Sequence, residues 1–211
     1  MNYHAESELP LAVLPASHVV SHVLLPDASG TMQKRFHATS RLDAAFQACV
    51  EYVQRLQDDA PDSQVAIISY SNDACRLLEW TRVSSLSDLT THQNEWLAQA
   101  CEHGLGRTNI ADALLEAAEM LDAGKGAAQV VLLTDGHHNI GCDPRPVAKR
   151  LKARATIATV GIGDDPQEVQ EHLLKQLASR GDDGAPLYRW IDDRGRLIAH
   201  FSSLAGRLTR S

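Results

Sequence analysis

The chain is poor in cysteine and in aromatic residues: four of its 211 residues are cysteine, and 5% are Phe, Trp or Tyr. No two cysteines form a CxxC pair, and their wide separation fits neither a disulfide framework nor a zinc ribbon. We therefore expect free, reduced thiols at Cys49, Cys75, Cys101 and Cys142.

Long apolar runs are also missing. The best run, from His18 to Leu25, is interrupted by His22 and falls far short of the roughly 18 residues that a membrane-spanning helix needs. The N-terminal residues lack a basic start followed by an apolar stretch, so no signal peptide is predicted. Together with the reduced thiols, these absences lead us to expect a cytoplasmic protein that does not interact with a membrane.

Basic residues are outnumbered by acidic ones. Lys and Arg total 20 and Asp and Glu total 27, which gives a formal net charge of −7 and a pI near 5.8. Because binding to a phosphate backbone needs a basic face, we expect no nucleic-acid partner. The apolar share of 44% and the charged share of 22% are close to globular averages, so the chain is predicted to fold around a sizeable core.

The chain does contain an alternation of short apolar runs and longer amphipathic stretches. Nearly continuous apolar runs that end in turn residues are typical of strands covered on both faces in a parallel sheet. The predicted strands are Val19–Leu25, Val65–Tyr70, Gln129–Leu133, Thr156–Ile162 and Leu187–Ile191, and the predicted helices are Asp43–Gln57, Asn109–Ala123, Pro146–Ala153 and Gln167–Arg180. This order indicates an α/β fold with a doubly wound, mostly parallel central sheet and helices on both faces.

The remaining segments predict an edge strand of the sheet, a last helix and the limits of the domain. Segment Ala74–Val83 comes only three residues after the second predicted strand, which is too few for a parallel crossover, so we expect an antiparallel edge strand. A last helix on the core is predicted from a stripe at helical spacing: Leu197, Phe201, Leu204 and Leu208. Ser84–Thr91 is interpreted as a polar loop. Residues 18–211 are predicted to form one domain, with residues 1–17 as an N-terminal arm or an extra edge strand.

Oxygen-bearing side chains follow three of these segments. The first strand runs into Asp27, Ser29 and Thr31, which are spaced by two and can point to one side of a loop. Asp135 follows the strand at residues 129–133, and Thr108 lies in a Gly-rich turn that opens a helix. Because ligands of open α/β sheets bind outside the carboxyl ends of the strands, we expect these side chains to converge. Carboxylate and hydroxyl oxygens suit Mg²⁺, Mn²⁺ or Ca²⁺, with water completing the coordination shell.

The set Asp27-x-Ser29-x-Thr31, Thr108 and Asp135 resembles the metal-ion-dependent adhesion site (MIDAS) of von Willebrand factor type A (vWA) domains, also called integrin-inserted domains. Longer stretches are similar to the bacterial and intracellular members of this family in order and spacing, namely Gly106–Leu114, Val131–Gly136 and Val160–Asp164. The resemblance covers residues 19–208 and implies the Rossmann-like fold of the family.

Two positions depart from the family's pattern. Thr31 stands where Ser is commoner, which keeps the hydroxyl. Pro26 precedes Asp27, where the family usually has an apolar residue with a free backbone N–H. Since proline removes a donor and fixes φ, we expect the end of the strand to be locally unusual.

The resemblance also implies a function. In the family, Ser29 and Thr31 would be direct metal ligands, Thr108 and Asp135 would bind directly or through water, and Asp27 would act mostly through water and hydrogen bonds. Neutral hydroxyl ligands leave the ion's charge under-compensated, so a carboxylate from a partner protein can fill its open position. We therefore expect an accessory or scaffold binding module rather than an enzyme, with Mg²⁺ (or Mn²⁺ or Ca²⁺) as cofactor. Intracellular relatives suggest an AAA-type ATPase or a kinase or phosphatase system as the partner.

Two alternatives to this function remain open. Asp27-x-Ser29-x-Thr31 is one substitution from the Asp-x-Asp-x-Thr loop of haloacid-dehalogenase-type phosphatases, which use Mg²⁺, and Gly163-Asp164-Asp165 could pass for their downstream acidic motif. The general acid of that chemistry is replaced here by Ser29, whose hydroxyl does not titrate near neutral pH. The other alternative is a vWA scaffold with a vestigial metal site, for which Pro26 is the clue.

Simpler interpretations apply to some of these residues. A polar side chain beside a helix is often only an N-cap, and both Thr108 and Asn109 are candidates for the cap of the helix that follows. His137, His138 and Cys142 could hold a transition metal, but adjacent histidines point apart and no fourth ligand has a compatible spacing. We interpret these three as exposed loop residues beside the partner-binding face.

Overall fold

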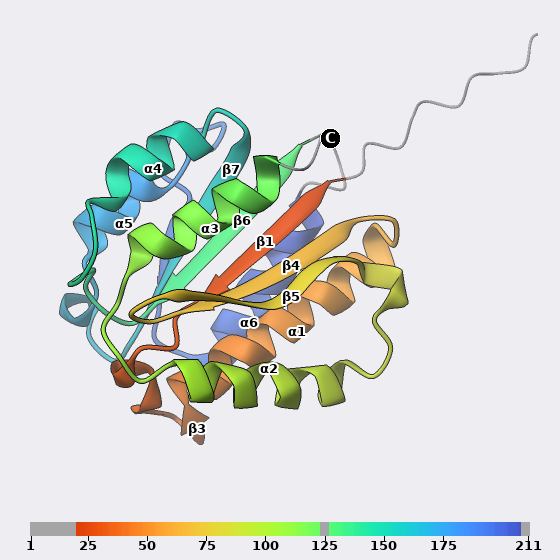
Figure 1. Ribbon diagram of the computed structural model, residues 1–211, viewed down its shortest axis with the longest axis horizontal. Coiled ribbons are helices and arrows are strands. Elements are labelled where there is room, and N and C mark those ends of the chain that lie inside the picture. Colours follow the sequence, from red (N-terminus) through yellow and green to blue (C-terminus); the bar gives the residue numbers. More distant parts are fainter. Residues whose placement is uncertain (1–19, 123–126, 208–211) are drawn as a thin grey trace, which may run out of the picture.

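A computed structural model describes residues 20–122 and 127–207 (Figure 1). Its centre is a six-stranded sheet in the order β5-β4-β1-β6-β7-β8. The strands are β1 (Ser21–Pro26), β4 (Gln64–Tyr70), β5 (Ala74–Arg82), β6 (Ala128–Thr134), β7 (Ala155–Ile162) and β8 (Tyr188–Ile191). β5 pairs antiparallel with β4 at one edge, and the other pairs in this sheet are parallel. The predicted fold class is confirmed.

Helices cover both faces of this sheet. One face carries α1 (Arg41–Asp59), α2 (Leu89–His103) and α6 (Arg194–Arg207), and the other carries α3 (Ile110–Asp122), α4 (Pro144–Leu151) and α5 (Glu171–Leu177). The short elements are η1 (Gly30–Gln33), η2 (Val83–Ser85), η3 (Pro166–Glu168) and a small hairpin of β2 (Arg35–Phe36) and β3 (Thr39–Ser40). Within the described ranges, no helix is both long and apolar enough to span a membrane.

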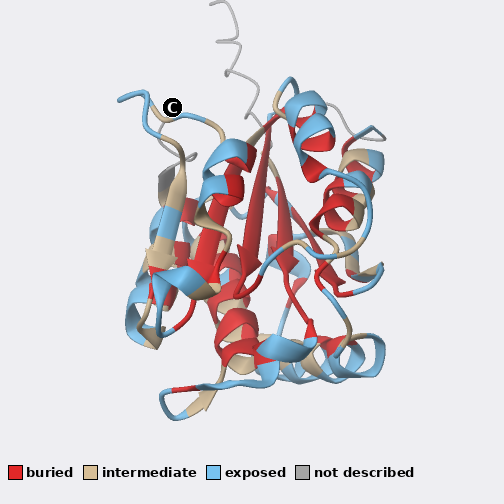
Figure 2. Cartoon of the chain, turned by 90° about the vertical axis from the view of Figure 1, so that its left-hand side faces the viewer, coloured by how far each residue is buried: buried red, intermediate tan, exposed pale blue. Residues whose placement is uncertain are grey.

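Alternate residues of the central strands point into two separate cores. Leu24 and Val131 pack in the core beneath α1 and α6, whereas their neighbours Val23 and Val130 pack in the core beneath α3, α4 and α5. Figure 2 shows the central strands buried, with the outer sides of the helices exposed. Because both faces are covered, these strands are apolar at nearly every position, which is why they were visible in the sequence as continuous runs.

The boundaries of several elements differ slightly from the predicted ones. α1 begins at Arg41 because Ser40 and Asp43 form a capping box around its first turn. α4 begins at Pro144 because Asp143 caps it and proline suits the first helical turn. The predicted arm at residues 1–17 lies outside the described residues, as do Val19, Ala123 and Leu208 at the ends of predicted elements.

Helix α2 was not predicted, and its first residues fall in the segment interpreted as a polar loop. The helix begins after Asp88, whose side chain accepts a hydrogen bond from the Thr91 N–H (3.2 Å). Only Trp96 and Ala100 are buried along it. A helix with so narrow an apolar face gives too weak a periodic pattern to be recognised in the sequence.

The helix predicted at residues 167–180 is broken into η3 and α5. Val169 lies between them in an extended conformation and is buried against β7. At Gly161 of β7, an added Cβ would lie 3.2 Å from Cγ2 of Val169, so the glycine allows this close approach. The packing of Val169 thus takes precedence over a continuous helix, and it leaves Glu168 in a separate short turn.

In this sheet order, the chain leaves β1 and β6 in different directions at their carboxyl ends. β1 leads through α1 to β4 on one side, whereas β6 lies on its other side. Connections that diverge in this way open a crevice at the carboxyl ends of the strands. The loops that follow β1 and β6 therefore meet at this point.

Pro26 is the last residue of β1 and lies opposite Leu133 of β6. Beyond it, the Asp27 N–H donates to the Leu133 carbonyl (3.0 Å) and the Ala28 N–H donates to the Tyr70 carbonyl of β4 (2.7 Å). Since donors alternate between the two neighbours of a strand, Pro26 stands where β1 would donate to β4. The unusual strand end expected from the sequence is this one missing bond, after which the pairing continues.

Candidate metal centre

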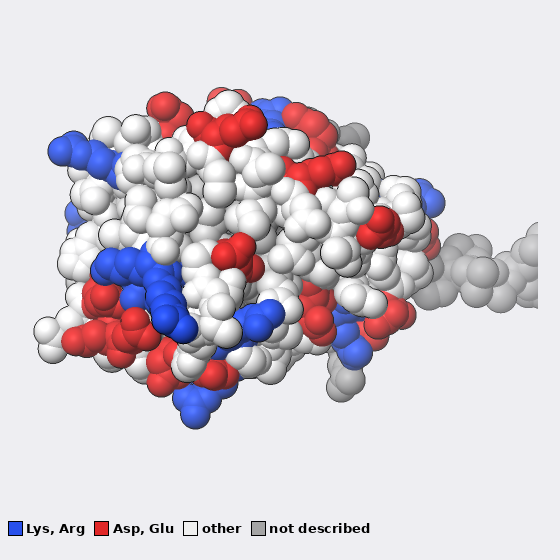
Figure 3. Space-filling view, turned by 90° about the horizontal axis from the view of Figure 1, so that it is seen from below, with Lys and Arg blue, Asp and Glu red and all other residues white. Residues whose placement is uncertain are grey.

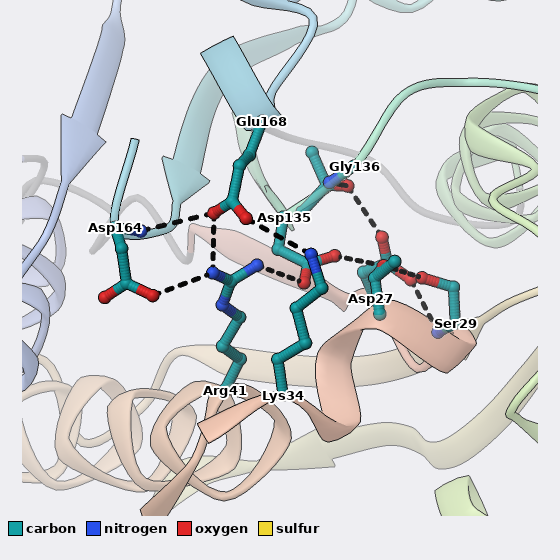
Figure 4. Close-up of polar contacts among 10 residues, drawn as sticks. Asp27, Ser29, Lys34, Arg41, Asp135, Gly136, Asp164 and Glu168 are labelled. Carbon is teal, nitrogen blue, oxygen red and sulfur yellow. Dashed lines mark hydrogen bonds and ion pairs between the residues drawn. The ribbon is translucent and has the colours of Figure 1, made fainter. Parts of the chain in front are cut away.

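The structure brings the predicted site residues together at the carboxyl ends of β1 and β6, and Figure 4 shows Asp27, Ser29 and Asp135 among them. The Ser29 Oγ and Thr31 Oγ1 atoms lie 3.3 Å apart, and the Thr31 hydroxyl donates to Asp135 Oδ1 (2.6 Å). A Cβ added to Gly136 would lie 3.4 Å from Thr108 Oγ1 and 3.5 Å from Thr31 Oγ1. The glycine therefore leaves a small space that these two hydroxyls border.

Thr108 is not the cap of the helix that follows it. The side chain of Asn109 accepts a hydrogen bond from the Asp112 N–H (3.3 Å) and caps α3. Thr108 is instead held by its backbone, whose N–H donates to Asn139 Oδ1 (3.0 Å) and whose carbonyl accepts from the Asn139 N–H (3.1 Å). The Thr108 hydroxyl is therefore available to the candidate centre. Of the two cap candidates, Thr108 and Asn109, the structure identifies Asn109 as the N-cap of α3.

Asp27 is fully buried and orients the loop around it. Its Oδ1 accepts from the Ser29 N–H (2.7 Å), and its Oδ2 accepts from the Thr134 hydroxyl (2.6 Å). Burial raises the pKa of Asp27 to about 7, an effect that the Thr134 bond opposes and the nearby Asp135 reinforces. A cation beside this carboxyl would favour its ionised form.

Asp135 has donors on both carboxylate oxygens. Thr31 donates to Oδ1, and the Arg41 guanidinium donates to Oδ2 through Nη1 (2.9 Å). Arg41 is 1% exposed and also pairs through Nη2 with Glu168 (2.6 Å) and Asp164 (3.2 Å). Burial acts to lower the pKa of Arg41, but its bonds to Asp135 and Glu168 raise it overall.

Arg41 and Glu168 were missed as site residues in the sequence. Arg41 lies just before the helix predicted at residues 43–57, and Glu168 was included only as part of the helix predicted at residues 167–180. A signal was present for Arg41, because it lies at helical spacing from the buried Ala44, Ala45 and Ala48 on the core side of α1. An arginine on the buried face of a helix needs a charged partner.

The donor set fits a hard divalent cation. It offers the hydroxyls of Ser29, Thr31 and Thr108 and the carboxylates of Asp27 and Asp135, which suit Mg²⁺, Mn²⁺ or Ca²⁺. Ser29, Thr108 and Asp135 are buried, whereas Gly30 and Thr31 are exposed, so the centre is reached from solvent at η1. In the described part of the chain, no three His, Cys, Asp or Glu residues lie together as a metal-binding group. A cation at the candidate centre would therefore need the hydroxyl oxygens of Ser29, Thr31 and Thr108 as ligands.

The neighbouring loop residues take structural roles. His138 is half-buried, and its Nδ1 accepts from the Ile110 N–H at the start of α3 (3.2 Å), so it was wrongly interpreted as an exposed residue. His137 and Cys142 are exposed as expected, and Cys142 is a free thiol. Asp165 accepts from the Gln167 N–H and caps η3 (2.9 Å).

The comparisons with known proteins establish the family. Residues 23–189 match the family described as von Willebrand factor type A domain, so the chain belongs to the vWA family, whose fold serves as a protein-interaction module. No curated protein matches the chain.

Several solved structures share the fold. A von Willebrand factor type A protein from Catenulispora acidiphila has a TM-score of 0.72 and 19% identity, and the alignment covers 92% of this chain and 43% of that one. The PilB minor pilin from Streptococcus sanguinis has a TM-score of 0.76 and 14% identity, covering 93% and 62%. The vWF domain of the type V pili tip protein Mfa5 from Porphyromonas gingivalis has a TM-score of 0.69 and 14% identity, covering 90% and 95%. The chain spans less than half of the length of the Catenulispora protein.

The expectation of a cytoplasmic protein is contradicted by these structures. They include a minor pilin, a pilus adhesin from Lactobacillus rhamnosus GG and a pili tip protein, and pili are displayed on the cell surface. One of these proteins is described as a pilus adhesin, and vWA homologues are mainly adhesion or scaffold modules, which is consistent with a protein that is not an enzyme.

Proposed function

We propose that the chain is a metal-dependent protein-binding module. Ser29 and Thr31 would bind Mg²⁺, or Mn²⁺ or Ca²⁺, with Asp27, Thr108 and Asp135 around them, and a carboxylate of a partner protein would complete the shell. The observation that carries this proposal is the convergence of three hydroxyls and two carboxylates at the carboxyl ends of β1 and β6.

The charges of the centre favour binding over catalysis. The carboxylates of Asp27 and Asp135 already accept hydrogen bonds from neighbouring residues, and the remaining ligands are neutral hydroxyls. An ion bound in this way keeps much of its charge and attracts a further anion. Exposed Gly30 and Thr31 leave room for that anion to come from another protein.

Because the chain is acidic, a bound divalent cation would be required for it to bind a partner's carboxylate. The chain carries a formal charge of −7, and Figure 3 shows one face on which Lys and Arg stand among Asp and Glu. Without the cation, this net charge would repel a partner carboxylate within a Debye length of about 8–10 Å. The ATPase, kinase or phosphatase partner expected from the sequence stays a prediction, and the similar pilus proteins favour a partner outside the cell.

Titration calorimetry with Mg²⁺ and with Mn²⁺ tests the metal site. The wild type is expected to bind the ion, and Ser29→Ala is expected to lose binding because it removes a ligand. Ser85→Ala is the matched control, since Ser85 is exposed in η2 and its hydroxyl donates to the Arg82 carbonyl at the end of β5 (2.7 Å). Absence of heat in the wild type would favour the alternative of a scaffold with a vestigial site.

Capture of a partner tests the second half of the proposal. The chain is immobilised and exposed to a cell extract with Mg²⁺, and bound proteins are released by chelator. A partner should be captured by the wild type and by Ser85→Ala, but not by Ser29→Ala. A partner retained equally by all three in the presence of chelator would contradict a metal-bridged contact.

An enzymatic function makes a different prediction. If the chain were a haloacid-dehalogenase-type phosphatase, it would turn over a phosphomonoester with Mg²⁺, and Asp27→Asn would abolish that turnover. We expect no turnover, because Ser29 stands where the general acid would be. The exposed Asp164, which could have belonged to a downstream acidic motif, pairs instead with Arg41.

A further inference from the structure

Arg41 contacts the candidate metal ligand Asp135 directly, but the proposed function assigns Arg41 no role. Its guanidinium lies between two groups of carboxylates, with Asp135 on one side (2.9 Å) and Glu168 and Asp164 on the other (2.6 and 3.2 Å) (Figure 4). Glu168 also pairs with Lys34 (3.1 Å). Arg41 is therefore shared between the candidate metal ligand and the turn η3.

The contact with Arg41 changes what Asp135 can do. One oxygen of Asp135 accepts from Arg41 and the other from the Thr31 hydroxyl (2.6 Å). The proton of Thr31 is thereby directed to Asp135, so one lone pair of Oγ1 can accept from the Ser29 hydroxyl (3.3 Å) and the other is left for a cation. A carboxylate whose charge is balanced by a buried guanidinium also attracts a cation less strongly.

We propose that Arg41 is a positioning residue that holds Asp135 out of direct contact with the metal ion and so keeps the ion's charge available for the partner's carboxylate. This inference rests on the proposed function, because it assigns Arg41 a role at the same centre. This role and a purely structural role predict opposite changes in metal affinity. Removing a residue that only supports the structure would weaken metal binding, whereas removing Arg41 should strengthen it, because Arg41 opposes direct binding by Asp135.

The expected effects of two substitutions have opposite signs. Arg41→Met removes a positive charge beside the centre and frees Asp135, so Mn²⁺ should bind about tenfold more tightly. Glu168→Gln keeps Arg41 but removes one of its counter-charges, which should weaken Mn²⁺ binding by about threefold. Both affinities are measured by calorimetry with Mn²⁺ alone.

Water-proton relaxation of the Mn²⁺-loaded protein gives a second readout. If Asp135 becomes a direct ligand in Arg41→Met, it displaces Mn²⁺-bound water, and the relaxation enhancement should fall relative to the wild type. Acetate, added as a carboxylate probe, should then bind the loaded variant more weakly than the loaded wild type. Unchanged relaxation and unchanged acetate binding would overturn the inference.

Arg55→Met is the matched control for the loss of an arginine. Arg55 lies on the same helix about 21 Å further along, where it pairs with Asp59 (2.8 Å), and Mn²⁺ affinity should be unchanged. Weaker or unchanged Mn²⁺ binding in Arg41→Met overturns the role of Arg41 alone. Absence of Mn²⁺ binding in the wild type overturns the proposed function and this inference with it.

Glu168→Gln keeps the inference testable if Arg41→Met does not fold. The Glu168 side chain is partly exposed, so its loss is tolerated more easily than that of a buried arginine. In that case, weaker Mn²⁺ binding in Glu168→Gln supports the inference, and unchanged or tighter binding overturns it.

Discussion

At the scale of single residues, burial decides the charge state of the groups around β1. His22 lies in β1 and Asp27 directly follows it; both are buried, and burial raises the pKa of the Asp27 carboxyl to about 7 but lowers the pKa of the His22 imidazole to about 4. In both cases the neutral form is favoured because the charged form loses its hydration. A bound cation would reverse this effect at Asp27, whereas His22 lies next to Tyr52 and away from the candidate centre.

His22 makes the stability of the protein sensitive to mild acid. Because its pKa is about 4 in the folded state and about 6.5 in the unfolded chain, protons bind preferentially to the unfolded chain. The stability contributed by neutral His22 is therefore complete above pH 6.5 and is lost as the pH falls toward 4. Between pH 7 and pH 5 this loss amounts to about 2 kcal/mol.

His22→Asn tests this effect, since the amide can keep a bond to the Tyr52 hydroxyl without titrating. Urea unfolding at pH 7 and pH 5, in the presence of chelator, should show that the wild type loses about 2 kcal/mol more than the variant. The raised pKa of Asp27 acts in the opposite direction in both proteins and cancels in this difference. Equal losses in the two proteins would contradict the assignment.

At the scale of elements, close packing between β7 and the segment after η3 sets the path of the chain. Val169 packs against Gly161, and the hydroxyl of Tyr188 in β8 would lie 3.3 Å from a Cβ added there. The space at Gly161 is therefore bordered by Val169, between η3 and α5, and by Tyr188 of β8. It fixes the break between η3 and α5, and this break gives Glu168 its position beside Arg41.

Gly161→Val is expected to destabilise the protein by about 1–3 kcal/mol, because the added side chain overpacks this contact. Combining it with Val169→Ala should cost at least about 1 kcal/mol less than the sum of the two single changes, since the second change makes room for the first. Chemical denaturation measures both. The control pair is Gly161→Val with Val147→Ala, a buried residue of α4, for which the two costs should add. Additive costs in the first pair would show that Gly161 and Val169 do not compete for the same space.

At the scale of the whole molecule, metal binding should be visible as stability. An ion that binds only the folded state stabilises it by about 2.7 kcal/mol when its concentration is 100 times its dissociation constant. For a domain of this size, that corresponds to a rise in the melting temperature of roughly 5–10 °C. Mn²⁺ should produce this rise in the wild type and in Ser85→Ala, and chelator should reverse it.

Ser29→Ala separates this effect from unspecific binding of cations to an acidic surface. Its melting temperature should stay within about 1 °C on addition of Mn²⁺, because a ligand of the ion is missing. An equal rise in Ser29→Ala would show that the ion acts through the net charge of −7 rather than through the candidate centre.

The sequence by itself determined the order of the strands and of most helices, and the residues at the strand ends. Apolar runs such as residues 129–133 are readable because strands covered on both faces must be apolar throughout. The positions of Asp27, Ser29, Thr31 and Asp135 followed directly, since each comes just after such a run. Fold class and candidate centre were therefore predicted from local pattern together with the resemblance to the vWA family.

Only the tertiary structure decided which partners the buried charges have. The contact of Arg41 with Asp135 joins residues that are 94 positions apart, and the contact with Glu168 spans 127. Local periodicity contains no information about such pairs, because they form only when the loops after β1, β6 and β7 meet at one edge of the sheet. The same holds for α2, whose narrow apolar face becomes apparent only when Trp96 is seen packed against the core.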